Sequence, residues 1–446
     1  MGRLFGTDGV RGPAGTVLTA ELALRLGRAA VLGAADPTDG GPAAPPRVLV
    51  VRDTRASGPM LEAAFAAGAA AVGADVRLAG VLPTPAAALL VRELGFTIAA
   101  VVSASHNPFA DNGIKLFGPD GRKLPDDAEA RVATLAAEPI GDGAWGTSIG
   151  AIGPLLGARE DYLRALDVRF ADLDLTGRRI ALDCAHGATA GVAPDAFRRR
   201  GADVVVIGDR PDGRNINDGV GSTHPGALSR TVVEHGCDVG FAFDGDGDRL
   251  LAVDHAGRAY DGDELLAIMA LHLRATGRLA GGVAVTVMSN HGFGLAMAAA
   301  GIPTATTPVG DRHVVAALAE RGWSLGGEQS GHIIETGFVP SGDGIASALL
   351  TLEAIGDDRL ADRRAMESLP QVLVNVAVTD RDAAMEDGGL AAAIDREARG
   401  LEGRGRVLVR ASGTEQLVRV MAEAPTVDEA QAVCDRLVAD VPGRAG

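Results

Sequence analysis

The sequence predicts an α/β protein built from about four units, and three observations carry this prediction. Apolar strand-like runs alternate with Ala- and Leu-rich helical stretches along the 446 residues. A chain of this length holds about two to four domains. Hydrophobic residues make up 47% and charged residues 22%, as in proteins with extensive cores. We expect units over residues 1–152, 153–254, 255–366 and 367–446.

The expected elements follow from runs of β-branched and apolar residues between turn signals. The clearest predicted strands are Val48–Val51, Ile98–Val102, Ile180–Cys184, Val204–Ile207, Val239–Phe243, Val283–Met288, Val372–Val378 and Val407–Arg410. The clearest predicted helices are Leu61–Val72, Asp263–Leu273 and Asp311–Glu320. In α/β sheets the loops that follow strand ends carry the chemistry, so those loops are the candidate functional sites.

Charge and cysteine content narrow the class of protein. The formal net charge of −16 argues against a general nucleic-acid binder, which needs a basic surface. A phosphate substrate is still compatible, because a local basic cleft can exist in an acidic protein. We expect no membrane span and no signal peptide, since apolar stretches are short and interrupted. The three cysteines are far apart and form no metal or disulfide pattern, which indicates a reducing, cytoplasmic environment.

The strongest chemical signal is the run from Asp244 to Arg249, directly after a predicted strand. It places Asp244, Asp246 and Asp248 in one loop, separated by glycines that let the backbone curl. Two unit charges 4 Å apart repel by about 1 kcal/mol in water and about 4 kcal/mol at an effective dielectric of 20. A bound hard cation removes this repulsion, and three carboxylates with open positions suit Mg²⁺. A solvated acidic turn is the alternative interpretation.

A second loop follows the strand Ile98–Val102 and contains two serines, Ser103 and Ser105. A serine in a turn of small residues can present its hydroxyl to a ligand, but the neutral alcohol needs activation before it attacks phosphorus. His106 and Lys115 are the nearby candidates for that activation. An ordinary turn is equally compatible with this segment, because Asn-Pro is a turn dipeptide.

Three more loops combine glycine with polar groups. The loop after Val407–Val409 carries Arg410, Ser412, Gly413 and Thr414, with Arg419 nearby, and predicts a phosphate cradle. The loop from Gly326 to His332 carries a carboxylate, an amide, a hydroxyl and an imidazole, a set that suits sugar hydroxyls or an amine. The loop from Gly6 to Gly12 contributes Arg11. Each alone is compatible with a simple turn. However, the serine turn, the metal loop, the sugar-type loop and the phosphate cradle fall one per unit, which fits a central cleft between four domains.

Together these segments resemble the α-D-phosphohexomutase superfamily over essentially the whole chain. The resemblance implies three related α/β domains with mixed sheets and a smaller α+β domain at the C-terminal end. It implies that Ser105, the serine directly before His106, is the phosphorylated residue, and that its phosphate supplies the fourth protein ligand of the metal. It also implies an isomerase that moves phosphate through a 1,6-bisphosphate intermediate.

The resemblance further implies a role for each motif residue. Catalytic roles fall to Ser105, Lys115, Arg11 and His106, and Mg²⁺ binding to Ser105, Asp244, Asp246 and Asp248. Sugar-phosphate binding falls to Arg249, Gly310, Asp311, Glu328, Ser330, His332, Arg410, Ser412, Gly413, Thr414 and Arg419. Lys115 is the candidate general acid or base, and we expect the nearby positive charge of Arg11 to lower its pKa. The resemblance also suggests a glucosamine or glucose 1,6-bisphosphate primer and a homodimer.

Within the superfamily, the opening segment 3–12, Gln329 and the segment 215–224 resemble the branch that acts on glucosamine phosphates. The mannose- and glucose-phosphate branches usually carry Met at the position of Gln329. Ala411, Gln416, Val220 and His313 depart from the usual pattern but remove no catalytic group. The alternatives are a phosphomannomutase/phosphoglucomutase, a metal-dependent phosphatase that uses water, and a non-catalytic sugar-phosphate sensor.

Overall fold

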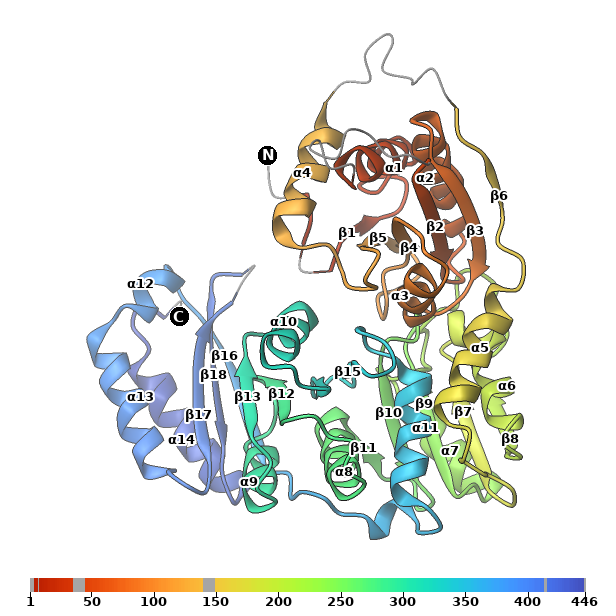
Figure 1. The fold of residues 1–446 in the computed structure, drawn as a ribbon. Coiled ribbons are helices and arrows are strands. Elements are labelled where there is room, and N and C mark those ends of the chain that lie inside the picture. Colours follow the sequence, from red (N-terminus) through yellow and green to blue (C-terminus); the bar gives the residue numbers. More distant parts are fainter. Residues whose placement is uncertain (1–3, 7, 35–44, 139–148, 413–414, 445–446) are drawn as a thin grey trace. The chain divides into compact units, whose positions relative to one another are not determined.

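The computed structural model of the chain describes residues 4–6, 8–34, 45–138, 149–412 and 415–444. The chain divides into two compact units. The first comprises Met1–Met288 with Pro303–Arg364, and the second comprises Ser289–Ile302 with Ala365–Gly446. Figure 1 shows the helices and strands of both units with their labels. No helix among the described residues is long and apolar enough to cross a membrane.

The N-terminal part of the first unit is built on a mixed sheet with the strand order β1-β5-β4-β2-β3-β6. Its strands are β1 (Val10–Pro13), β2 (Arg47–Arg52), β3 (Asp75–Val81), β4 (Ile98–Val102), β5 (Asp111–Phe117) and β6 (Ile152–Pro154). Its helices are α1 (Ala20–Ala34), α2 (Gly58–Ala71), α3 (Thr84–Glu93) and α4 (Asp126–Ala137). Strands β4, β2, β3 and β6 run parallel, whereas β5 runs antiparallel to both β4 and β1.

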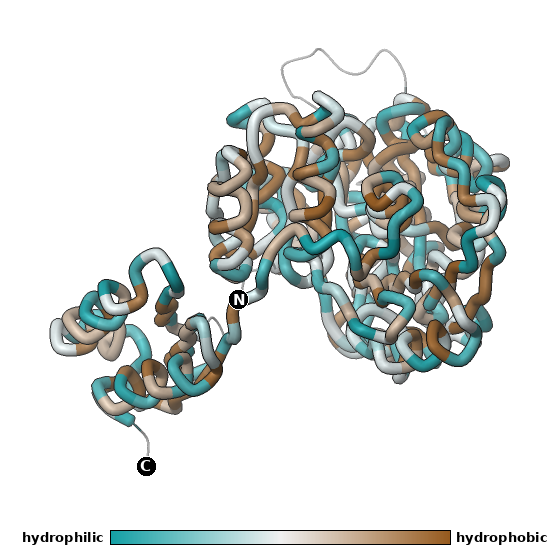
Figure 2. The backbone as a smooth tube through the Cα atoms, turned by 90° about the horizontal axis from the view of Figure 1, so that it is seen from below, coloured by the Kyte–Doolittle hydropathy of each residue, from teal (hydrophilic) through white to brown (hydrophobic). Residues whose placement is uncertain are grey.

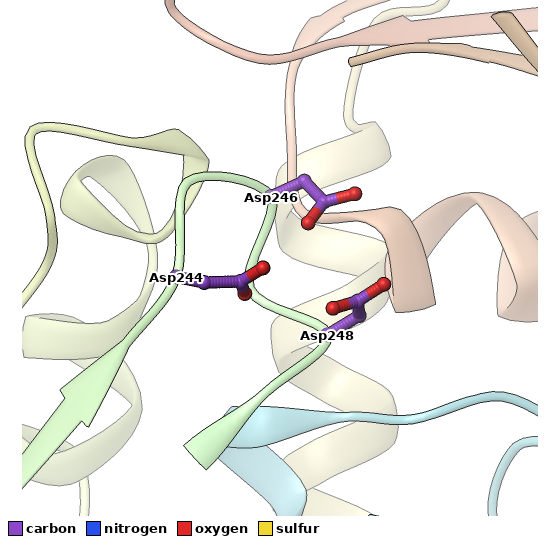
Figure 3. Close-up of side chains that lie close together, drawn as sticks. All are labelled: Asp244, Asp246 and Asp248. Carbon is purple, nitrogen blue, oxygen red and sulfur yellow. The ribbon is translucent and has the colours of Figure 1, made fainter. Parts of the chain in front are cut away.

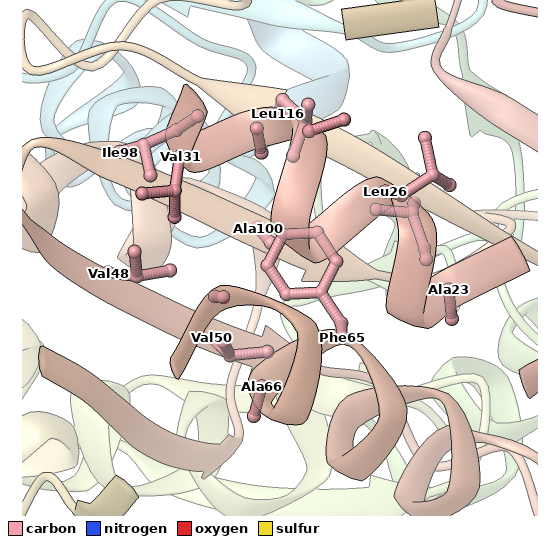
Figure 4. Packing of buried hydrophobic residues seen from close by; sticks show 14 of the residues in the cluster. Ala23, Leu26, Val31, Val48, Val50, Phe65, Ala66, Ile98, Ala100 and Leu116 are labelled. Atoms are coloured by element: carbon pink, nitrogen blue, oxygen red, sulfur yellow. The ribbon is translucent and has the colours of Figure 1, made fainter. Parts of the chain in front are cut away.

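This sheet is buried on both faces, which is typical of parallel sheets in α/β proteins. Val48 and Val50 of β2 pack into a core with Leu26 of α1, Phe65 of α2 and Val132 of α4, and Figure 4 shows part of this cluster. The intervening residues of β2 are also buried, but they lie outside this cluster because successive side chains point to opposite faces. Both faces are therefore covered, and chemistry is confined to the strand ends.

Two further mixed sheets complete the first unit. The second sheet has the order β11-β10-β9-β7-β8, and the third has the order β13-β12-β14-β15. Their strands are β7 (Arg179–Asp183), β8 (Asp203–Ile207), β9 (Val239–Phe243), β10 (Leu250–Asp254), β11 (Ala259–Tyr260), β12 (Val283–Thr286), β13 (Thr304–Thr307), β14 (Leu325–Gly327) and β15 (Ile333–Glu335). The helices are α5 (Ala158–Arg169), α6 (Ala193–Arg198), α7 (Gly226–His235), α8 (Gly262–Ala275), α10 (Asp311–Arg321) and α11 (Gly344–Ile355).

The second unit contains a small, wholly antiparallel sheet with the order β16-β18-β17 among the residues described. Its elements are β16 (Gln371–Ala377), β17 (Arg406–Ala411), β18 (Leu417–Glu423), α9 (His291–Ala299), α12 (Arg381–Met385), α13 (Gly388–Gly400) and α14 (Val427–Asp440). Val418 and Val420 of β18 pack against Leu390 of α13 and Leu437 of α14. Figure 2 shows polar and apolar stretches alternating along these helices, as expected for helices with one buried face.

The observed architecture confirms the predicted fold class, three mixed α/β sheets followed by a smaller antiparallel one. The predicted strands and helices are found with small shifts at their ends. Helix α2 begins at Gly58, three residues before its predicted start. Strand β12 ends at Thr286 instead of Met288, where the Thr286 hydroxyl accepts a hydrogen bond from the Met288 N–H. Short strands such as β11 and β15 were not predicted, since two or three residues carry too little periodicity to be recognised.

Asp343 caps helix α11 from a buried position and makes the stability of the first unit depend on pH. Its carboxylate accepts hydrogen bonds from the Ala346 N–H and from the Tyr162 hydroxyl, both at 2.9 Å. Burial raises the pKa of Asp343 to about 6, although these hydrogen bonds act in the opposite direction. The folded state therefore holds a proton that the unfolded state releases near pH 4. This contribution to stability is present at low pH and is lost as the pH rises through about 6.

We expect Asp343→Asn to cancel this pH dependence, because asparagine keeps the cap acceptor but cannot ionise. Between pH 4.5 and 7.5 the variant should gain on the order of 2–3 kcal/mol of unfolding free energy relative to the wild-type chain. Urea unfolding of both proteins at the two pH values measures the difference. Parallel pH profiles for the two proteins would contradict the prediction.

Candidate active site

The three aspartates of the predicted metal loop lie together between β9 and β10. Strand β9 ends at Phe243 and β10 begins at Leu250, so the loop carries Asp244, Asp246 and Asp248 within one tight turn. One carboxylate oxygen from each lies within 4.8 Å of the others, and all three side chains are buried (Figure 3). Burial, followed by the charges of Asp248 and Asp246, raises the pKa of Asp244 well above its ordinary value. The mutual repulsion expected from the sequence is therefore present.

The loop has free oxygen ligands for a hard cation. Asp246 Oδ1 and Asp248 Oδ1 are buried and have no hydrogen-bond partner among the described residues. The other oxygen of Asp246 accepts hydrogen bonds from Thr84 Oγ1 at 2.6 Å and from Lys115 Nζ at 2.8 Å, which fixes the orientation of the carboxylate. Buried bare carboxylate oxygens are costly unless a cation or donor meets them. The donor set, three carboxylates and no sulfur or imidazole, fits Mg²⁺.

Ser105 lies against this loop although 139 positions separate it from Asp244. Its hydroxyl donates a hydrogen bond to Asp244 Oδ2 at 2.5 Å, and the residue is 1% exposed. Its backbone has a φ of 53°, a left-handed conformation that is uncommon for a residue with a side chain. Ser103 serves a different purpose, since its hydroxyl accepts from the Ser105 N–H and donates to Asp53. Of the two serines, only Ser105 contacts the aspartate loop.

The Ser105 loop is held in place by a buried guanidinium. Arg55 is fully buried, forms an ion pair with Asp53 at 2.8 Å, and donates to the carbonyl oxygens of Ser105, Asn107, Pro108 and Asp111. The Asn217 amide adds hydrogen bonds to two of these same carbonyls, those of Ser105 and Asn107. Buried polar groups are stable only when their hydrogen-bonding capacity is met, and here four donors of one side chain meet the curled loop while the fifth meets Asp53. This network stabilises the left-handed backbone at Ser105.

Lys115 lies on β5, and its side chain reaches the aspartate loop. Its ammonium is 2.8 Å from Asp246, 3.3 Å from Asp248 and 3.4 Å from Asp8. Burial lowers the pKa of Lys115, but these three carboxylates outweigh burial and Arg11, and the net pKa lies well above the ordinary value. The expected lowering of this pKa is therefore wrong. The prediction considered the positive charge of Arg11, but it did not include the three carboxylates that the fold brings to Lys115.

Arg11 and His106 complete the predicted catalytic group. Arg11 lies on β1, beside β5, and forms an ion pair with Asp8. The His106 Nδ1 is 3.4 Å from the Ser105 hydroxyl. Burial, together with the positive charges of Arg249 and Arg11, lowers the pKa of His106 to about 4. His106 is therefore a neutral imidazole near pH 7, able to accept or donate a hydrogen bond.

A cavity of about 440 Å³ opens beside the aspartate loop within the first unit. It is lined by Asp8, Lys123, Asp248, Arg249, Thr286, Met288, Val309, Gly310, Asp311, Glu328, Gln329, Ser330 and His332. Its walls therefore contain all six sugar-phosphate residues that the resemblance placed in this unit. Its lining contains both cations and carboxylates, a combination suited to a ligand with both phosphate and hydrogen-bond donors.

Asp311 and His332 connect the start of helix α10 to the aspartate loop across the cavity lining. Asp311 begins α10 and accepts from Lys123 Nζ at 2.5 Å, while its carboxylate is 3.5 Å from His332 Nε2. His332 Nδ1 in turn is 3.7 Å from Asp248 Oδ1. Burial lowers the pKa of His332, but Asp248 and Asp311 together raise it above the ordinary value. A chain of charges thus links the aspartate loop to the loop predicted to bind sugar.

The predicted phosphate cradle belongs to the second unit. Arg410 and Arg419 are directly paired across β17 and β18, and burial together with the Arg419 charge lowers the pKa of Arg410. Like charges in register repel, so an anion between them would be stabilising. Ser412 follows β17 and its N–H donates to the Leu417 carbonyl. The remaining two members, Gly413 and Thr414, lie outside the described residues.

Several residues that the structure places in or behind the site were not predicted from the sequence, among them Asp8, Arg55, Thr84 and Lys123. Asp8 lies in the loop from Gly6 to Gly12, in which only Arg11 was predicted to be functional. Thr84 stands between two prolines just after β3, and Arg55 follows the end of β2, so their positions after strands were the available signal. Lys123 lies in a turn with no local pattern, and only the tertiary structure shows that it meets Asp8 and Asp311.

Comparison with known proteins places this chain and its fold in the phosphohexomutase class. Family profiles match the chain in four consecutive segments: alpha/beta/alpha domain I of phosphoglucomutase/phosphomannomutase over residues 2–139, domain II over 160–257, domain III over 261–372, and the C-terminal domain over 373–440. Members of this class are isomerases.

Curated relatives called phosphoglucosamine mutase from Arthrobacter sp. (strain FB24) and Nocardioides sp. (strain ATCC BAA-499 / JS614) are 48% and 50% identical to this chain. Their alignments cover all of this chain and 98% and 99% of theirs, so the chain belongs to the phosphoglucosamine mutase family.

Solved structures show the same fold over nearly the whole chain. A phosphoglucomutase/phosphomannomutase family protein from Burkholderia thailandensis superimposes with a TM-score of 0.79 at 24% identity, covering 98% of both chains. The N-acetylphosphoglucosamine mutase of Aspergillus fumigatus, solved with GlcNAc-6P and magnesium, has a TM-score of 0.69 at 19% identity, covering 98% of this chain and 95% of its own.

Proposed function

We propose that this protein interconverts glucosamine 6-phosphate and glucosamine 1-phosphate through a phosphorylated Ser105 and a 1,6-bisphosphate intermediate. The observation that carries the proposal is the buried Ser105 hydroxyl against three clustered aspartates, two of which keep an oxygen without a hydrogen bond. A phosphatase that activates water at the aspartate loop would not need a serine in contact with the metal ligands. The full-length relatives called phosphoglucosamine mutase supply the choice of sugar.

The reaction consists of two phosphoryl transfers in opposite directions. The bond between Ser105 Oγ and phosphorus breaks while a free sugar hydroxyl forms the new oxygen–phosphorus bond, which gives the bisphosphate and a free serine. The intermediate then turns round, and the serine oxygen takes the other phosphoryl group. In each transfer the attacking hydroxyl loses one proton and the leaving oxygen gains one. Phosphoryl transfer depends mainly on positioning and on stabilising charge, which the site's cations provide.

Individual side chains divide this work. Lys115 holds its proton in this state, so it would act first as the acid that protonates the leaving oxygen and then as the base in the return step. Arg249 and Lys123, both lining the cavity, would hold the transferring phosphoryl group. Glu328, Ser330 and His332 would bind the sugar hydroxyls and amine. In the second unit, Arg410, Ser412, Gly413, Thr414 and Arg419 would bind the non-reacting phosphate.

We also propose a metal cofactor, a bisphosphate primer and a cytoplasmic location for this protein. Asp244, Asp246, Asp248 and the phosphate of Ser105 would bind Mg²⁺, which supplies positive charge that offsets the charge developing on the transferred group. Glucosamine or glucose 1,6-bisphosphate would load Ser105 before the first turnover. Three buried free cysteines agree with a reducing, cytoplasmic location. We further expect a homodimer, which analytical ultracentrifugation can measure.

A substrate panel combined with phosphopeptide mapping tests the proposal. Purified protein is assayed with glucosamine, glucose and mannose 6-phosphates, each with and without a catalytic amount of bisphosphate. We expect turnover to be fastest with glucosamine 6-phosphate, to need the bisphosphate, and to coincide with a phosphate on Ser105.

Each other outcome points to a different function. Faster turnover of glucose or mannose 6-phosphate would make the protein a phosphomannomutase/phosphoglucomutase. Net release of inorganic phosphate without primer would indicate a phosphatase, and binding without turnover would indicate a sensor. Any of the three results would overturn the proposal.

A further inference from the structure

The loop that carries Glu328 and Gln329 is held by backbone contacts from two neighbouring segments. The Gly262 N–H donates to the Gln329 carbonyl, and the Leu250 N–H donates to the Gly331 carbonyl, both at 3.0 Å. A Cβ atom on Gly262 would lie 2.2 Å from the Glu328 carbonyl oxygen, so the start of α8 packs directly on this loop. The backbone of the loop is therefore rigidly placed, and side-chain orientation decides what it offers the cavity.

The Gln329 side chain is oriented by a carboxylate behind the loop. Asp261 is the N-cap of α8, where its Oδ1 accepts from the Glu264 N–H at 3.1 Å. Its other oxygen, Oδ2, accepts from Gln329 Nε2 at 3.2 Å. An ionised carboxylate can only accept hydrogen bonds, so the amide must present its NH₂ group to Asp261. If the amide were reversed, Gln329 Oε1 would face Asp261 Oδ2, and two acceptors would repel each other. The carboxylate therefore determines that Nε2, and not Oε1, faces Asp261.

This orientation leaves the amide oxygen free for a ligand. Gln329 lines the 440 Å³ cavity between Glu328 and Ser330. No described residue donates a hydrogen bond to Gln329 Oε1, and the neighbouring Glu328 carboxylate uses one oxygen to accept from the Gly310 N–H. This part of the wall therefore offers an amide oxygen and a carboxylate, which are acceptors. An ammonium group has three donors and no acceptor, whereas a hydroxyl has one donor, so the wall complements the ammonium better.

We propose that Asp261 is the positioning residue that makes the cavity selective for an amino sugar phosphate, because it holds the Gln329 amide with its oxygen toward the ligand. The inference rests on the proposed function for the identity of the two substrates compared. Asp261 lies outside the residues that line the cavity, and it acts on the ligand only through Gln329. The same carboxylate caps α8, so the experiment has to separate selectivity from loss of the cap.

Asp261→Asn separates the two roles. Asparagine is as good an N-cap as aspartate, so α8 should keep its first turn. Its amide can accept from the Glu264 N–H and present its own NH₂ group to Gln329, which then reverses and turns its NH₂ toward the cavity. We expect kcat/KM for glucosamine 6-phosphate to fall by about 10- to 100-fold, the usual effect of losing one hydrogen bond to a charged group. The value for glucose 6-phosphate should change by less than about threefold, because a hydroxyl can donate or accept.

A second substitution should restore the preference. Glutamate at position 329 has no NH₂ group, so in the double variant Asp261→Asn/Gln329→Glu one oxygen accepts from Asn at 261 and the other faces the ligand. We expect the ratio of kcat/KM values for the amino and hydroxy sugars to return to the wild-type value or above it. Glu264→Gln serves as the matched control, since it alters the same helix cap without contacting Gln329, and its ratio should stay unchanged.

The outcomes distinguish this inference from the proposed function. An unchanged ratio in Asp261→Asn, or an equal loss with both sugars that the double variant does not repair, would overturn the inference and leave the mutase activity intact. A wild-type protein that turns over neither sugar, or prefers glucose 6-phosphate, would overturn the proposed function. Dissociation constants for both sugar phosphates, measured by calorimetry, provide the same ratio independently of turnover.

Discussion

Ser105→Ala is expected to abolish mutase turnover, with a loss of at least about 10³-fold, while the fold is retained. The loss is large because the substitution removes the atom that carries the phosphoryl group, and no other described hydroxyl contacts Asp244. The fold should survive because the hydrogen bonds that shape the loop use the backbone of residue 105 and not its hydroxyl. A coupled assay measures turnover, and thermal unfolding measures the stability of the fold. Mass spectrometry of the bisphosphate-treated protein shows whether residue 105 carries a phosphate.

Ser103→Ala is the matched control for this prediction. Its hydroxyl lies two residues away and contacts Asp53, not the aspartate loop. We expect this variant to lose some activity, because the Ser105 N–H loses its acceptor, but still to gain one phosphate on Ser105. Phosphate mapped to residue 103 in the wild-type protein, or substantial turnover by Ser105→Ala, would contradict the assignment of the carrier.

Asp246→Ala is expected to abolish both turnover and the response to magnesium. The substitution removes a bare buried oxygen from the cation position and leaves two of the three carboxylates. A ligand that binds only the folded state raises its stability, so the wild-type melting temperature should rise with Mg²⁺ concentration and that of the variant should not. Turnover should fall by about 10³-fold or more, because the developing charge loses its principal stabilisation.

The melting measurement requires no active enzyme and so isolates cation binding. Asp254→Asn is a suitable control, since Asp254 is also buried and ends the adjacent strand β10, but accepts hydrogen bonds from the backbone of its own turn. Its Mg²⁺ response should match that of the wild-type protein. An Mg²⁺-dependent rise in the melting temperature of Asp246→Ala as large as that of the wild type would contradict the location of the cation.

The sequence was sufficient for the aspartate loop because its three members are neighbours in the chain. Any tight turn after a strand brings them together, so no tertiary information was needed. Ser105 was harder, since only the packing of two different sheets brings it to Asp244. Residue types alone left Ser103 and Ser105 equivalent, and the structure separates them by their partners, Asp53 for one and Asp244 for the other.

Electrostatic predictions failed where the decisive charges were distant in sequence. The pKa of Lys115 is raised by Asp8 and Asp246, which lie 107 positions before it and 131 positions after it in the chain. Arg55 was missed for a related reason, because a side chain that binds backbone carbonyls leaves no recognisable motif at the positions it supports. These hydrogen bonds depend on where the backbone carbonyls lie, and not on which side chains the bound residues carry.

The contacts around Asp246 have a consequence for how the site gains and loses its cation. Thr84 and Lys115 belong to the N-terminal sheet domain, and their hydrogen bonds to Asp246 tie that domain to the aspartate loop without any metal. Removing the cation therefore leaves the two domains attached. Loss of a cation would also leave the carboxylate of Asp246 held in place by Thr84 and Lys115, so it stays oriented for the next cation.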